Sequence, residues 1–217
     1  AGTGVGKTQT LQDLIAELLG SSAPPSLVVI DSQGDMLGKI ARLDLFAPGR
    51  GRLRDKLVII DPRDVAYPPA LNLFAVNHRR LAALDAATRE QMMNGLVELY
   101  ETIFTAILDA GMTQKQSVLF RFLARLLIAI PGATIQTLRQ VLDDPTPFKP
   151  YIDRLTGTAH EFLSKQFNAK DFQQTREQVL RRLYGILEQP TFERMFSTAA
   201  MKLDLFEALQ GGKIVLI

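Results

Sequence analysis

The chain has 217 residues, with 25 Lys or Arg residues against 23 Asp or Glu residues and no cysteine. This length provides for a substantial core, and a formal net charge of +2 is too small to argue by itself for a nucleic acid or a membrane as partner. The lack of cysteine excludes disulfides and cysteine-ligated zinc. No apolar run approaches the roughly 20 residues of a membrane span.

The first ten residues form a glycine-rich stretch that is typical of a phosphate-binding loop. Gly6, Lys7 and Thr8 supply the specific half of the Walker A pattern G-x-x-x-x-G-K-[ST], whose first glycine is replaced here by Ala1. In that pattern the lysine contacts the β- and γ-phosphates of ATP, and the Thr8 hydroxyl binds Mg²⁺. Apolar residues then recur at helical spacing, so a helix beginning within the loop would aim its positive end at the phosphates: Leu11, Leu14, Ile15, Leu18 and Leu19.

Two apolar runs that each end in aspartate predict buried parallel strands, at Leu27–Asp31 and at Leu57–Asp61. The residues after the first run lie at the strand end where ligands bind in open α/β sheets. Either terminal aspartate is a candidate for the carboxylate that orients Mg²⁺. Neither is followed by glutamate, which a strand-end general base for water would require. A last run, Ile214–Ile217, predicts a returning strand.

Between these strands the pattern changes to long helical periods. Apolar residues share one face over residues 92–108, 118–130 and 173–188, and Thr134 is positioned to cap a further helix. Residues 1–77 and 202–217 are therefore predicted to form a nucleotide-binding core, and residues 78–201 an all-α domain inserted into it. We also expect the chain to be part of a longer ATPase, because a phosphate loop normally follows a strand and none precedes Ala1.

Arginines in the helical segment suggest two further roles. Arg176, Arg181 or Arg182 could serve as an arginine finger that reaches the γ-phosphate held by a neighbouring subunit, although ordinary helix-surface charge is the commoner role. The pairs Arg79–Arg80 and Arg181–Arg182 could also contact DNA phosphates.

Several segments occur in a recognisable order: A-G-T-G-V-G-K-T, then V-V-I-D-S-Q-G-D, then I-I-D-P-R-D with L-N-L-F, a helical stretch, and G-G-K-I-V-L-I. This order resembles the HerA/FtsK-type DNA-pumping ATPases, and within them the conjugative coupling proteins of type IV secretion. The resemblance implies an α/β fold, a RecA-like P-loop NTPase core with a parallel sheet and an inserted all-α domain. It also implies which residues bind the nucleotide: Thr3, Gly4, Val5, Gly6, Lys7, Thr8, Gln9, Asp31, Gly34 and Asp35.

The function implied by this resemblance is the ATP-binding part of a hexameric motor that translocates DNA, with ATP and Mg²⁺ as cofactors. Its partners would be DNA, further copies of the chain, and a relaxase or secretion-channel protein. Its location would be the cytoplasm, including the cytoplasmic face of the inner membrane. The Walker B Asp-Glu pair of the family has no match here, so the catalytic residues are unknown and this chain alone is expected to be inactive.

Two alternatives stay open. One is a P-loop kinase or another soluble NTPase in which the helical segment is a substrate lid, and convergent Arg and Asp near the loop would favour it. The other is a non-hydrolysing, ATP-binding assembly scaffold whose helical part binds a protein. ATP binding without DNA-stimulated hydrolysis would favour the scaffold.

Overall fold

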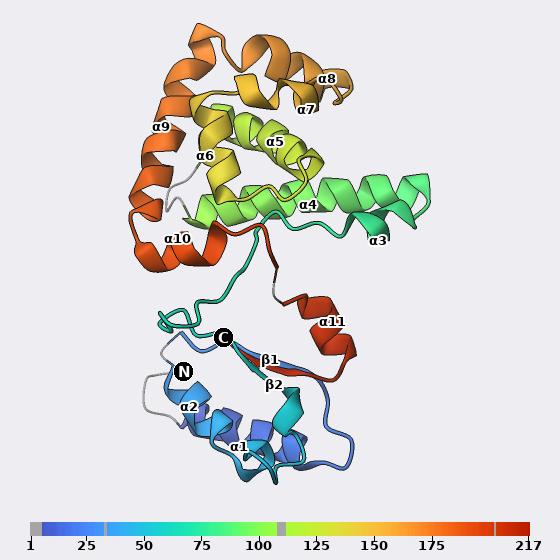
Figure 1. The fold of residues 1–217 in the computed structure, drawn as a ribbon, viewed down its shortest axis with the longest axis vertical. Coiled ribbons are helices and arrows are strands. Elements are labelled where there is room, and N and C mark those ends of the chain that lie inside the picture. Colours follow the sequence, from blue (N-terminus) through green and yellow to red (C-terminus); the bar gives the residue numbers. More distant parts are fainter. Residues whose placement is uncertain (1–5, 33, 108–111, 202) are drawn as a thin grey trace. The chain divides into compact units, whose positions relative to one another are not determined.

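The computed structural model of the protein describes residues 6–32, 34–107, 112–201 and 203–217 (Figure 1). Contacts between residues divide the chain into two compact units. We call Ala1–Pro69 with Leu203–Ile217 the sheet unit, and Ala70–Lys202 the helical unit.

The sheet unit is built around a parallel sheet of three short strands, which are β1 (Leu27–Val29), β2 (Leu57–Ile59) and β3 (Ile214–Leu216). Their order is β1-β3-β2, so the strand from the far end of the chain lies between the other two. The helices of this unit are α1 (Lys7–Gly20), α2 (Asp35–Ala41), η1 (Asp44–Phe46), η2 (Arg54–Lys56) and α11 (Leu205–Gln210).

One face of this sheet is covered by α1 and α2. Alternate residues of a strand point to the same face, and in this unit Val29, Ile214 and Leu216 share a buried cluster with the two helices. The helical contribution follows the spacing of four residues that places side chains on one helix face: Ile15 and Leu19 from α1, and Met36 and Ile40 from α2.

The helical unit is a bundle of longer helices with short connections. Its elements are α3 (His78–Ala82), α4 (Ala86–Ile107), α5 (Gln114–Ala129), α6 (Ile135–Asp143), η3 (Thr146–Phe148), α7 (Lys149–Ile152), α8 (Gly157–Glu161), the π-helical turn η4 (Phe162–Gln166), α9 (Lys170–Leu187) and α10 (Pro190–Phe196). Capping fixes where two of them begin. Thr113 and Gln116 form a reciprocal capping box at α5, and Thr134 caps α6 as the sequence predicts.

A single large core holds the helical unit together. Phe104 from α4 stacks on Phe120 from α5 with ring centroids 4.6 Å apart, and Phe74 stacks on Phe104 at 5.9 Å. Fully buried leucines of α5, such as Leu119 and Leu123, extend this core. Burial of one such side chain contributes about 1.5–3 kcal/mol, so the packing of α4 and α5 is a main source of stability.

The predicted fold class, a RecA-like P-loop core with an inserted all-α domain, is wrong. The protein is 61% helical, and its described residues form only a three-stranded parallel sheet, so it is a small, mostly helical protein. Each apolar run yields just three paired residues, whereas an average strand has about 5–6 residues. The sheet they form has three strands, whereas an average sheet has about 5–6. The larger share of apolar residues follows the helical period and packs in the helical unit.

No described helix combines the length and the low polarity that are needed to cross a membrane.

Candidate functional site

Helix α1 begins directly after a glycine in the left-handed conformation. Gly6 has φ 70° and ψ 9°, and the helix starts at Lys7. A residue with a side chain would be strained there, although a Cβ would meet no atom within 4 Å, so the backbone angle is what requires glycine. The first bond of the helical ladder runs from the Thr10 N–H to the Gly6 carbonyl, at 2.9 Å. The N–H groups of Lys7, Thr8 and Gln9 therefore precede the ladder.

Within the part of the chain that the structure describes, no side chain caps this end of α1, and its first turn holds no acidic residue. The Thr10 hydroxyl donates to the Gly6 carbonyl at 3.2 Å, and the Gln9 side-chain amide donates to Asp13 at 2.9 Å. Both side chains are thus directed along the helix, while the Thr8 side chain is exposed. Free N–H groups and the helix dipole make such an end attractive to an anion.

Part of the predicted phosphate loop lies outside the described residues. This part comprises Thr3, Gly4 and Val5, together with the side chain of Lys7.

A pocket of about 340 Å³ lies at the carboxyl ends of the three strands. Parallel strands all end at the same edge of a sheet, and Ile30, Ile60 and Ile217, which each follow one strand, line this pocket together. Asp31 and Gly34, from the predicted nucleotide site, also line it. Asp35 is exposed and is not part of the lining.

The hydrogen bonds of Asp31 tie it to the start of α2. Its carboxylate accepts the backbone N–H of Met36 at 2.8 Å, and its own N–H donates to the Ile217 carbonyl at 2.9 Å. Gly34, with φ 78°, directly precedes this helix. Asp31 therefore holds the loop after β1 against the end of β3, which is a structural role beside the nucleotide role that the resemblance implies.

An arginine that the sequence pattern did not single out lines the same pocket. Arg63 donates from Nε and Nη2 to the two carboxylate oxygens of Asp61, at 3.0 and 3.2 Å. These hydrogen bonds hold the pKa of Asp61 below its usual range. The guanidinium lies 3.4 Å from the position that a Cβ on Gly34 would occupy, so the turn after β2 touches the turn after β1. The sequence feature that could have identified this contact is the position of Arg63, two residues after the aspartate that ends the second apolar run.

The hypothesis that Asp61 orients Mg²⁺ loses support from this ion pair, because Arg63 already neutralises the carboxylate. Among the described residues, no group of three or more His, Asp or Glu side chains is placed to hold a metal ion. A magnesium ion here would depend on Thr8 and on the oxygens of a bound phosphate.

The candidate arginine fingers all lie on α9 but differ in freedom. The guanidinium of Arg176 lies 4.7 Å from the ring centroid of Phe167 and is hydrogen-bonded within the helical unit. Arg181 pairs with Glu177 at 3.4 Å and is 76% exposed, and Arg182 is exposed as well. Arg176 is therefore fixed by packing, whereas Arg181 and Arg182 are exposed on the helix surface.

Comparison of the chain with protein-family models, with curated proteins and with solved structures finds no match in any of the three. We therefore infer function from the residues of the chain itself.

Proposed function

We propose that this protein binds a nucleoside triphosphate, as its Mg²⁺ complex, at the N-terminus of α1. The observation that supports this most directly is the left-handed Gly6 before an uncapped helix that starts with Lys7 and Thr8. The N–H groups of the first turn would donate to phosphate oxygens, and the lysine ammonium would balance their charge. The Thr8 hydroxyl would be a ligand of the magnesium ion.

The position of α1 in the sheet unit supports a site at the edge where the strands end. Only residues 21–26 connect the end of α1 to the start of β1, and residues of α1 and β1 pack in the same buried cluster. The helix therefore runs antiparallel to the strand. With a rise of about 1.5 Å per residue, α1 extends over roughly 21 Å, longer than any of the strands. Its N-terminus therefore points toward the edge that holds the pocket with Asp31 and Arg63.

The wider proposal is an ATP-binding part of a hexameric, cytoplasmic motor that hydrolyses ATP and translocates DNA, with a relaxase or secretion-channel protein as a further partner. The order of sequence segments supports it, whereas the architecture does not, because the predicted RecA-like core is absent from the described residues. Exposed arginines such as Arg181 and Arg182 are suited to phosphate contacts.

Nucleotide binding is tested by titrating the chain with Mg-ATP in a calorimeter. Lys7→Ala should abolish tight binding without changing thermal unfolding. The matched control is Lys39→Ala, which removes an exposed lysine from the last turn of α2 and should bind ATP as the wild type does. Equal affinity of the wild type and Lys7→Ala would show that this loop is not the nucleotide site.

A further inference from the structure

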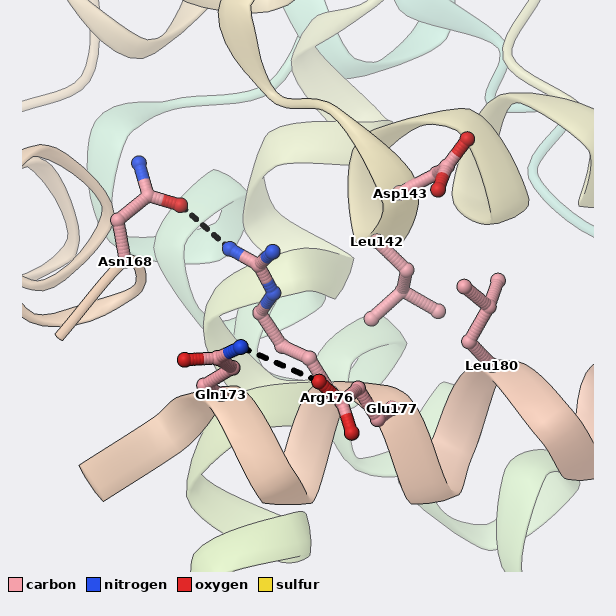
Figure 2. A pocket seen from close by; sticks show the side chains of 7 residues that line it. All are labelled: Leu142, Asp143, Asn168, Gln173, Arg176, Glu177 and Leu180. Atoms are coloured by element: carbon pink, nitrogen blue, oxygen red, sulfur yellow. Dashed lines mark hydrogen bonds between the residues drawn. The ribbon is translucent and has the colours of Figure 1, made fainter. Parts of the chain in front are cut away.

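A second pocket, of about 240 Å³, lies in the helical unit between the end of α6 and the first half of α9 (Figure 2). It belongs to the helical unit, whereas the proposed nucleotide site belongs to the sheet unit. Its lining combines one guanidinium, two carboxylates, two side-chain amides and two leucines.

The guanidinium of Arg176 is fixed within this pocket. It packs over the ring of Phe167, and Nη1 donates to the Asn168 side-chain oxygen and to the Phe167 carbonyl. Nε is buried without a hydrogen-bond partner, and Nη2 has no acceptor among the described residues. Burial lowers the pKa of Arg176, yet the group stays cationic because arginine remains protonated in proteins. One edge of a fixed cation is thus left without an acceptor.

The nearby carboxylates do not pair with this cation. Asp143 and Glu177 line the same pocket, and their charges favour the protonated Arg176, but within the described chain neither forms an ion pair with it. Glu177 instead accepts hydrogen bonds from Gln173 at 3.2 Å and from Arg181 at 3.4 Å. In Figure 2, the Arg176 guanidinium is directed toward Asn168, and the Asp143 carboxylate points away from it. The pocket therefore holds charges of both signs that are not paired with each other.

We propose that this pocket binds a small zwitterion, an aliphatic α-amino acid. Its carboxylate accepts from Nη2 of Arg176, its ammonium group donates to Asp143, and its side chain contacts Leu180 beside the buried Leu142. Two carboxylates against one guanidinium disfavour a phosphate, and the guanidinium disfavours a simple amine. A volume of about 240 Å³ corresponds to roughly eight waters and lies below the 300–1,000 Å³ typical of drug-sized ligands.

The test is calorimetric titration of the full chain with L-alanine, L-valine and L-leucine. N-acetyl-L-valine lacks the ammonium group and L-valinamide lacks the carboxylate, so each should bind about tenfold or more weakly than L-valine. Inorganic phosphate should not bind at this site. The proposal is overturned if none of the three amino acids binds, if the two blocked compounds bind as well as L-valine, or if phosphate binds more tightly than L-valine to the Lys7→Ala variant, in which the proposed nucleotide site is disabled.

Variants locate the site. Asp143→Asn changes an exposed side chain, so the fold should persist while L-valine affinity falls about tenfold. The matched control is Glu161→Gln, which removes an exposed carboxylate of α8 that does not line the pocket, and it should leave affinity unchanged. Equal affinity of Asp143→Asn and the wild type, with folding confirmed by circular dichroism, would contradict the assignment.

Discussion

The start of α2 beside the candidate site can be tested with two glycines of the same region. Gly34 has φ 78° just before the helix, whereas Gly38 lies within α2, is exposed, and has open space where a Cβ would be added, with no atom within 4 Å. Replacing each by alanine should therefore change stability in opposite directions.

The magnitudes follow from these conformations. At Gly34 a left-handed alanine costs about 1–2 kcal/mol, partly offset by about 0.4–1 kcal/mol from the less flexible unfolded chain. A Cβ there would meet only the end of the exposed Arg63 side chain, at 3.4 Å, so the backbone angle sets the cost. We expect Gly34→Ala to destabilise the protein by about 1 kcal/mol. Gly38→Ala should stabilise it by about 0.5–1 kcal/mol, because alanine is favoured inside a helix.

Urea unfolding followed by far-ultraviolet circular dichroism measures both changes. The two midpoints should shift in opposite directions from that of the wild type, with unchanged dependence on urea. Stabilisation by both substitutions would refute the left-handed conformation at Gly34, and with it the described loop after β1.

Two further predictions concern the helical unit. Burial raises the pKa of Glu101, but the hydrogen bonds from Ser117 and Arg121 together lower it by more than burial raises it. The pKa in the folded protein therefore lies below that in the unfolded chain. The stabilisation is complete above the unfolded value of about 4.3 and is lost as pH falls through the lower folded value. The stability difference between wild type and Glu101→Gln, from urea unfolding at several pH values, should therefore shrink in acid, and a constant difference would contradict this. Reversing Arg181 and Arg182 to Glu should weaken DNA binding equally for all sequences, and the salt slope measured by fluorescence anisotropy should become shallower by about 0.9 for each duplex phosphate that the variant no longer neutralises. An unchanged slope would remove α9 from the DNA-binding surface.

Local elements of this fold follow closely from the sequence. The apolar runs beginning at Leu27, Leu57 and Ile214 form β1, β2 and β3, and the periodic stretches form α1, α4, α5 and α9. These elements depend on side-chain spacing within a few residues. Thr134 caps α6 for the same local reason.

The fold class could not be obtained in this way. Four apolar residues in a row predict a strand but not how many strands pair, and here the strand from the end of the chain supplies the centre of the sheet. The order of segments suggested a larger core than three strands of three residues provide. The number and order of strands depend on the pairing of segments that are distant in the sequence, and such pairing leaves no local pattern in the sequence.

In the candidate site, too, local features follow from the sequence, whereas contacts between distant segments do not. A left-handed Gly6 at the start of α1 agrees with a glycine-rich loop followed by a periodic helix. The contact of Arg63 with Gly34 joins two turns that are distant in sequence. Likewise, the packing of Arg176 against Phe167 depends on the turn before α9, so its spacing on the helix suggested an exposed finger instead.

The central claim is that phosphates bind at the N-terminus of α1. Its most direct test is a titration of the ¹⁵N-labelled chain with Mg-ATP, followed by backbone amide chemical shifts. We expect the largest changes at Gly6, Lys7, Thr8 and Gln9, whose N–H groups precede the helical ladder, with smaller changes in the loop after β1. Unchanged amides in the first turn of α1, or changes confined to the helical unit, would contradict it.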